Sequence, residues 1–316
     1  MSRRRKGSAV HGWVIVDKPQ GLTSTQVVTA VRRVFDAQKA GHAGTLDPMA
    51  TGVLAVALGE ATKTVPFAME AEKTYRFTAR WGEARDSDDA EGRLTAESGI
   101  RPRREQIEAL LPRFIGEIAQ VPPAYSAIKV HGERAYDLAR EGEAVALEPR
   151  SVAIHEARVT GTPDADHTDF EMRCGKGAYV RAWVRDLARA LGTVGHVSRL
   201  RRTAIGGFSE KDAVPLETLQ RSMHSPAAFE YLRPISTALD GIPALAVTGP
   251  DAVRLRSGNP ILMRANLFAR LSEEADNDDL QGLTVYLSTG DGEPVALAAL
   301  QAGELRPFRV FNFGTG

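Results

Sequence analysis

The chain has 316 residues, 43% hydrophobic and 25% charged, a balance typical of a globular protein that buries a sizeable core. Its forty basic and forty acidic side chains cancel, so net charge alone gives no support for nucleic-acid binding. A single cysteine, Cys174, excludes an internal disulfide, and the scattered histidines argue against a zinc site. No apolar run could span a bilayer and the basic N-terminus lacks the apolar core of a secretory signal, so we expect a cytoplasmic protein.

The N-terminal part predicts a strand, a helix and a glycine-rich loop. Residues 13–16 predict the strand, and residues 24–35 predict a helix that follows a Thr-Ser cap. Residues 41–52 (GHAGTLDPMATG) contain three glycines, which can adopt positive φ or allow another segment to come close. The apolar run over residues 53–58 predicts a buried strand or a short buried helix.

Asp47 is the single carboxylate of this loop. The proline after it favours a turn and biases Asp47 away from helical backbone angles. A carboxylate on such a loop, braced by a core element, is one way to present a reactive group. The alternative is that Asp47 only caps the turn, as aspartate before proline often does. The loop taken alone favours this second interpretation.

The middle of the chain predicts a strand over residues 72–81 and a helix over residues 106–114. A Pro-Pro pair then opens a polar insertion, which covers about residues 121–150. Residues 152–159 and 169–174 alternate polar and apolar side chains like two paired strands.

A basic stretch follows, and it gives the sequence its main indication of nucleic-acid binding. Eight Lys or Arg stand between Arg173 and Thr203 against one acid. Three of the arginines share one face of a helix expected over residues 179–191. The acids gather elsewhere, at residues 86–91 and 273–279. A basic face on a chain of zero net charge can bind phosphates, although such a face is more often simply solvated.

The C-terminal part predicts a linker and a small β-rich domain. Prolines mark the linker over residues 222–242. Beyond it lie short β-like runs, at residues 246–248, 267–271, 283–287, 295–300 and 308–313. We therefore expect two domains, at residues 1–240 and 241–316.

Several segments between about residues 11 and 210 form a recognisable set. They are HGWVIVDKPQGLTS, GHAGTLDPMATGVL, KTYRF, PPAYSAIKVHGERAYDLAREG, and GKGAYVRAWVRDLARALG with HVSRLRRTAIGGF. In their residues and their order along the chain, these segments resemble the motifs of the TruB-type tRNA pseudouridine-55 synthases of bacteria.

The resemblance implies an α/β (α+β) pseudouridine synthase fold, with a mixed, largely antiparallel sheet flanked by helices. The insertion at about residues 121–150 is then an arm that grips the T-arm of tRNA, and residues 241–316 form a PUA-like β domain that binds RNA. The insertion also favours the stand-alone bacterial type over related synthases that act inside a guide-RNA particle.

The resemblance also assigns the catalytic roles. Asp47 stands at the position of the family's catalytic aspartate, and Arg181 at that of the arginine that pairs with it. An arginine suits this task because its planar fork holds one carboxylate geometry better than a lysine does. Tyr75 corresponds to the tyrosine that lies against the target base and serves in proton transfer. Without the resemblance, Tyr75 is better explained as a strand tyrosine packed on the core.

Five further residues receive binding roles in the same way. His42 corresponds to the histidine that fills the space vacated by the flipped base, and Tyr179 and Leu200 line the base pocket. Lys18 and Lys63 either contact the RNA backbone or brace the Asp47 loop. For Tyr179 and Leu200 the alternative is core packing, and for His42 it is an ordinary surface position.

The expected function is isomerisation of uridine 55 to pseudouridine in the T-loop of tRNA, with base flipping and an aspartate nucleophile. The reaction involves no redox change or energy input, so we expect no cofactor and no metal. The sequence also lacks the phosphate-loop and dinucleotide-binding motifs. We expect a monomer that needs no guide RNA, protein partner or membrane. The alternative from another class is an RNA chaperone that folds tRNA without chemistry.

Overall fold

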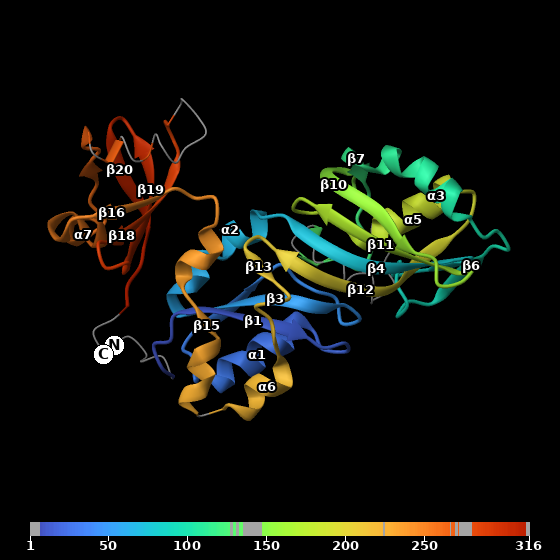
Figure 1. Cartoon of the computed structure of the whole chain (residues 1–316), viewed down its shortest axis with the longest axis horizontal. Coiled ribbons are helices and arrows are strands. Elements are labelled where there is room, and N and C mark those ends of the chain that lie inside the picture. Colours follow the sequence, from blue (N-terminus) through green and yellow to red (C-terminus); the bar gives the residue numbers. More distant parts are fainter. Residues whose placement is uncertain are drawn as a thin grey trace.

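The computed structural model describes residues 7–126, 129–130, 133–134, 147–223, 225–265, 267–268, 271 and 280–313. Most of the insertion expected at residues 121–150 and the acidic run at residues 273–279 therefore lie outside the described residues. An eleven-stranded sheet forms a large body, and a five-stranded sheet forms a smaller one beside it (Figure 1). In the described part of the chain, no helix is long and apolar enough to cross a membrane.

The large sheet is mixed and largely antiparallel, as the resemblance implies. Its main path runs β14 (Val214–Pro215), β1 (Gly12–Lys18), β3 (Thr51–Leu58), β12 (Gly195–Ile205), β4 (Lys73–Trp81), β11 (His167–Cys174), β10 (Arg150–Gly161) and β7 (Gly116–Gln120). Three short strands join its sides, namely β2 (Ala40–Ala43), β13 (Phe208–Ser209) and β15 (Leu232–Arg233). The expected pairing of residues 152–159 with 169–174 is confirmed as the antiparallel pair β10 and β11.

The helices of the large body are α1 (Ser24–Val34), α2 (Val65–Glu70), α3 (Arg104–Leu110), α5 (Val180–Ala190) and α6 (Leu216–Arg221). The short 3-10 helices are η1 (Gly59–Lys63), η2 (Leu111–Phe114), η3 (Pro226–Tyr231) and η4 (Ile235–Leu239). Two small hairpins pair β5 (Glu83–Arg85) with β6 (Leu94–Glu97) and β8 (Lys129–Val130) with β9 (Glu133–Arg134). Figure 1 shows α1 and α6 beside β1, and α5 with α3 at the other end of the sheet.

The apolar run after the glycine-rich loop forms the strand β3, which is buried on both faces. Successive side chains of a strand point to opposite faces. Leu54 and Val56 therefore pack with the valines of α1 in one core cluster, whereas Val53 and Ala55 pack in a second cluster on the other face. Burial on both faces explains why the run shows no alternation of polar and apolar residues.

The prediction of a linker over residues 222–242 is wrong. This segment contains η3, β15 and η4, and β15 pairs with β1 in the large sheet. Ala228, Ile235 and Leu239 are buried in the core. The prolines that suggested a linker instead stand at or just before the first turns of these 3-10 helices, where a missing N–H costs nothing.

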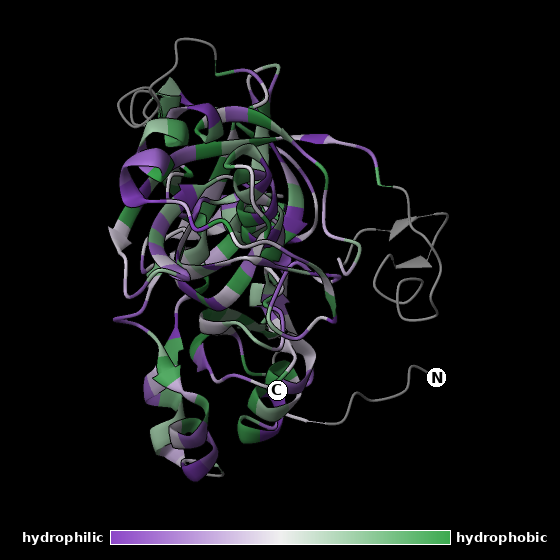
Figure 2. Ribbon diagram, turned by 90° about the vertical axis from the view of Figure 1, so that its right-hand side faces the viewer, coloured by the Kyte–Doolittle hydropathy of each residue, from purple (hydrophilic) through white to green (hydrophobic). Residues whose placement is uncertain are grey.

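The small body is a sheet in the order β16 (Ala244–Val247), β18 (Thr284–Thr289), β19 (Pro294–Gln301), β20 (Glu304–Val310) and β17 (Ile261–Leu262), with helix α7 (Gly249–Arg256) against it. Hydrophobic and hydrophilic residues alternate along many of the ribbons in Figure 2. The β-like run expected at residues 267–271 is wrong, because Leu267, Phe268 and Leu271 are helical. Buried Leu267 and Leu271 pack into the core cluster of this body, and a short apolar run does not distinguish strand from helix.

The small body shares a core with the large one. Phe311, just after β20, is 1% exposed and belongs to the same buried cluster as Trp13 of β1 and Phe208 of β13. Lys63 donates a hydrogen bond from Nζ to the main-chain oxygen of Val310 at 2.6 Å. The chain thus leaves the large body after η4 and returns to it after β20.

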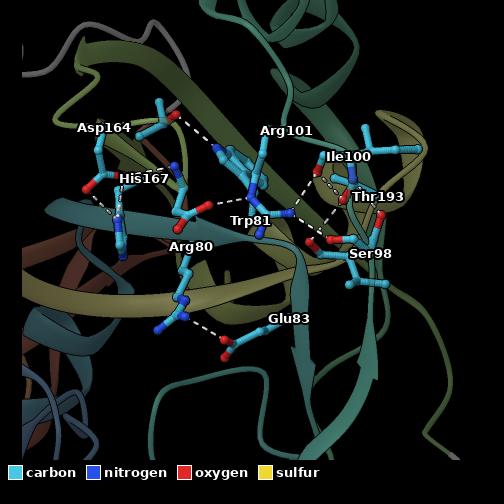
Figure 3. Close-up of polar contacts among 12 residues, drawn as sticks. Arg80, Trp81, Glu83, Ser98, Ile100, Arg101, Asp164, His167 and Thr193 are labelled. Carbon is cyan, nitrogen blue, oxygen red and sulfur yellow. Dashed lines mark hydrogen bonds and ion pairs between the residues drawn. The ribbon is translucent and has the colours of Figure 1, made fainter.

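Polar contacts close the far end of the large sheet (Figure 3). Arg101 donates from Nη1 to the main-chain oxygen of Ser98 at 2.7 Å, and Thr193 donates from Oγ1 to the main-chain oxygen of Ile100 at 3.0 Å. Arg80, near the end of β4, pairs with Glu83. The contacts of Arg101 and Thr193 fasten the loop around residue 100.

The shared core predicts that Phe311→Ala destabilises the whole chain. Truncating a buried phenylalanine typically costs about 3–5 kcal/mol in the free energy of unfolding. Phe308→Ala is the matched control, because Phe308 lies on β20 but is 42% exposed, and it should cost about 0.5 kcal/mol. Urea unfolding followed by tryptophan fluorescence measures both. Equal effects of the two variants would show that the small body does not complete the core of the large one.

Candidate active site

Asp47 lies in the connection between β2 and β3, which we call the Asp47 loop (residues 44–50). Two neighbouring segments brace this loop. Ser24 exchanges two hydrogen bonds with the backbone of Leu46, both at 2.9 Å. Lys18, at the end of β1, donates from Nζ to the Pro48 oxygen at 3.2 Å. The loop is therefore held on both sides of Asp47.

Arg181 of α5 is the partner of Asp47. Its Nη2 atom lies 3.0 Å from Asp47 Oδ2, and its Nη1 atom lies 3.4 Å from Asp89 Oδ2. The same guanidinium donates to the main-chain oxygens of Ser87 at 2.8 Å and Tyr125 at 2.9 Å. One side chain thus joins the Asp47 loop, an acidic loop and the start of the insertion.

The surroundings act on the charge of Asp47 in opposite directions. Burial raises its pKa above the ordinary value, the positive charge of Arg181 lowers it, and the negative charge of Asp89 raises it. The Asp47 side chain is 33% exposed whereas that of Arg181 is only 4% exposed. The carboxylate is therefore accessible to a ligand, while the cation that stabilises it is almost completely enclosed.

A cavity of about 530 Å³ opens above Asp47, within the usual size range of ligand sites. Five of the residues with expected roles line it, although they come from four separate parts of the chain: Asp47, Tyr75, Tyr179 with Arg181, and Leu200. The sheet explains this meeting, because β12 pairs with β3 on one side and with β4 on the other.

Two tyrosines form walls of the cavity. Burial raises the pKa of both phenols, so each remains a neutral hydrogen-bond donor. The backbone of Tyr179 is fixed by the Gln120 side chain. The Tyr179 main-chain N–H donates to Gln120 Oε1 at 2.8 Å, and its main-chain oxygen accepts from Gln120 Nε2 at 3.1 Å. An aromatic ring held in this way can cover the face of a flat ligand.

His42 lies on β2, before the Asp47 loop, and does not line the cavity. Among the residues that the structure describes, its buried Nδ1 atom has no hydrogen-bond partner. Burial lowers the pKa of His42, and the nearby positive charge of Arg202 acts in the same direction. The imidazole is therefore neutral at neutral pH.

The two lysines have partners within the protein. Lys18 is completely buried, and its ammonium donates to the oxygens of Pro19, Leu22 and Pro48. Lys63 is turned toward Glu60 and the Val310 oxygen, where the two bodies meet. Lys18 thus braces the Asp47 loop, because its ammonium donates to main-chain oxygens there. Lys63 joins the bodies, because it donates to the Glu60 carboxylate and to the Val310 oxygen.

Sequence reasoning missed Asp89. It placed the acids of residues 86–91 away from the basic stretch, but the two sets meet across the fold. Arg181 pairs with Asp89, and Arg185 pairs with Asp88 at 2.8 Å. About ninety residues separate the partners in the chain, and no local signal in the sequence connects them. Much of the apparent basic face of α5 is therefore neutralised within the protein.

In the described part of the chain, no group of three His, Cys, Asp or Glu side chains is arranged to hold a metal ion. The arrangement can instead present one carboxylate, oriented by an arginine, to a flat ligand between aromatic and apolar walls.

Comparison with known proteins identifies the chain's relatives. Residues 32–180 match the family model described as "TruB family pseudouridylate synthase (N terminal domain)", and residues 181–240 match "tRNA pseudouridylate synthase B C-terminal domain". A protein of Caulobacter vibrioides named tRNA pseudouridine synthase B is 56% identical over 312 residues, covering 99% of both chains. A protein of Dinoroseobacter shibae with the same name is 50% identical over 314 residues, again covering 99% of both chains.

Solved structures share the fold at lower identity. The chain in an archaeal box H/ACA Nop10–Cbf5 complex is 22% identical with a TM-score of 0.70, covering 95% of this chain and 86% of that one. A chain of an H/ACA ribonucleoprotein bound to a substrate RNA is 20% identical with a TM-score of 0.72, covering 99% and 92%. At this identity the likeness shows the fold alone, and it agrees with the α/β arrangement described above.

The burial of Lys18 generates a pH-dependent prediction. Burial lowers the pKa of Lys18 from the ordinary 10.5 to about 8. Between these two pH values the unfolded chain holds the Lys18 proton and the folded chain releases it, so stability due to Lys18 rises with pH. The difference in unfolding free energy between the wild type and Lys18→Met should therefore shift in favour of the wild type from pH 8 to pH 10. Urea unfolding measures it, with exposed Lys211→Met as the control; parallel pH profiles for wild type and Lys18→Met would contradict the assignment.

Proposed function

This chain belongs to the TruB family of pseudouridylate synthases, and on that premise we propose that it converts uridine 55 in the T-loop of tRNA to pseudouridine. Pseudouridine formation in tRNA rests on the family and on the 50–56% identity to enzymes of that name over nearly the full chain. The position in tRNA rests on the sequence resemblance. The observation that supports the chemistry best is the carboxylate of Asp47 beside Arg181 on the wall of a ligand-sized cavity.

Asp47 is the catalytic residue of this proposal. The reaction breaks the bond between uracil N1 and ribose C1′, turns the base, and forms a bond from C5 to C1′. The C5 proton is lost and N1 gains one, so atoms and electrons balance without an oxidant or reductant. An ionised carboxylate can act as a nucleophile toward the ribose or the base. Arg181 favours that ionised form and fixes its orientation.

The walls of the cavity suit a base that has left its stack. A base inside folded RNA must be extruded before its atoms can react, and enzymes then cover its faces with aromatic or apolar groups. Tyr75, Tyr179 and Leu200 supply such groups around Asp47. We assign Tyr75 to proton transfer as well, because it lines the same cavity as Asp47. Neutral His42, on the adjoining strand, is the candidate to fill the space that the base leaves.

The partner of this site is the T-arm of tRNA. The insertion proposed to grip it begins at the segment that Arg181 and Gln120 fasten to the cavity. We further propose that residues 241–316 act as a PUA-like RNA-binding domain, and that the protein works as a cytoplasmic monomer without cofactor, metal, guide RNA or protein partner. An RNA chaperone is the less favoured function, because phosphate binding gains nothing from an enclosed carboxylate–arginine pair.

Asp47→Asn should abolish turnover and leave tRNA affinity nearly unchanged. Asparagine keeps the shape of the side chain and removes the charge that attacks. Release of tritium from C5-labelled uridine should fall by at least about 1,000-fold, equivalent to about 4 kcal/mol, while the Kd for tRNA stays within about threefold. Asp36→Asn, on an exposed turn, is the control and should react like the wild type.

Two results would contradict different parts of the proposal. Turnover of Asp47→Asn within tenfold of the wild type would exclude Asp47 as the nucleophile. Chemical mapping that finds pseudouridine in tRNA only at another uridine would exclude position 55 and leave the chemistry in place.

A further inference from the structure

Arg202 of β12 is a buried cation for which the proposed chemistry assigns no role. It is 1% exposed. Within the described part of the chain, its side-chain hydrogen bonds go to two main-chain oxygens rather than to a carboxylate. A guanidinium that is buried without an acid needs several hydrogen bonds to offset its lost hydration. Its position therefore indicates a specific task.

The two main-chain contacts flank the Asp47 loop, one at its first residue and the other in β3, just beyond its last. Arg202 donates from Nη2 to the Gly44 oxygen at 2.9 Å and from Nε to the Val53 oxygen at 2.8 Å. Residues 44 and 53 enclose the whole connection that carries Asp47. One planar group thus holds the base of this loop closed.

This contact also explains two glycines of the loop. Gly44 has a φ of +70°, and a Cβ atom there would stand 2.9 Å from Nη1 of Arg202. Gly52 has a φ of +97°, and a Cβ atom there would stand 2.2 Å from the main-chain oxygen of Arg202. Both glycines are needed for backbone conformation and for the close approach of Arg202.

The third contact is Tyr75. Arg202 and Tyr75 are direct partners in the register of β12 and β4, so their side chains stand next to each other on one face of the sheet. A guanidinium can only donate, so where the two side chains meet the phenol oxygen is the acceptor. The hydroxyl proton of Tyr75 is then free to be donated in another direction. Both side chains line the cavity that Asp47 also lines.

We propose that Arg202 is a positioning residue, which holds the Tyr75 phenol against the two segments that flank the Asp47 loop and directs its O–H into the cavity. This inference rests on the proposed function, in which Tyr75 moves a proton beside Asp47. Arg202 acts through Tyr75 and the loop rather than on the uridine. The charges agree, because burial raises the pKa of Tyr75 and the positive charge of Arg202 opposes that rise.

The first experiment measures chemistry and binding separately. Arg202→Lys keeps the charge but loses the planar fork that reaches both main-chain oxygens and faces Tyr75. Its single-turnover rate should fall by about 30-fold or more, while its Kd for a T-arm RNA stays within about threefold. In a Tyr75→Phe background, the same change should cost less than about threefold further, because its main target is already gone. Arg80→Lys is the matched control on the neighbouring strand, since Arg80 pairs with Glu83 (Figure 3) and does not line the cavity.

The second experiment needs no RNA and therefore remains informative if the proposed function is wrong. With 3-fluorotyrosine at position 75, a 19F NMR titration follows this single phenol in the folded protein. Arg202→Gln removes the positive charge, so the phenol should ionise at a higher pH than in the wild type, whereas Arg80→Lys should not move it. A wild-type rate for Arg202→Lys would overturn the proposal. An unchanged titration combined with the same loss in both backgrounds would also overturn it, leaving Arg202 a purely structural residue.

Discussion

The contact between Arg181 and Asp47 is the constraint on which the rest of the site depends. A carboxylate at the wall of a cavity loses hydration, and burial alone would favour its protonated form. Arg181 offsets this effect only because its own position is fixed by Asp89 and by the main-chain oxygens of Ser87 and Tyr125. The acidic loop, the entry to the insertion and the Asp47 loop must therefore all be in place before the carboxylate has its working charge.

The fold supplies that fixed position through helix α5. Trp183 of α5, two residues beyond Arg181, packs edge-on against Phe77 of β4 and Phe170 of β11. Its Nε1 donates to the main-chain oxygen of Phe114 at 3.1 Å. The helix is thereby held against β4, the strand that also carries Tyr75. Core packing and catalysis are linked directly, because a shift of α5 would move the cation away from Asp47.

The sequence predicted the elements that carry local signals and missed the contacts that depend on the fold. β3, β4 and α5 have strong periodicity or apolar runs, and Asp47 and Arg181 were identified through the resemblance. Asp89 and Arg202 were not found, since a residue of an acidic run and one of a basic run look solvated until the strands are assembled. Lys18 and Lys63 could not be separated from phosphate-binding lysines, because their carbonyl partners are set by tertiary structure. The segment 222–242 was misjudged for a related reason, as prolines also begin short helices.

The most direct test of this account is the pKa of Asp47 itself. NMR of aspartate labelled with 13C at the carboxylate, with Asp47→Asn to assign the signal, measures it in the intact protein. The account predicts that Asp47 titrates above its ordinary 3.8, because burial raises its pKa more than Arg181 lowers it. It also predicts that Arg181→Met raises the pKa further, because the opposing positive charge is lost. An Asp47 that titrates at its ordinary value and does not respond to Arg181→Met would contradict the account.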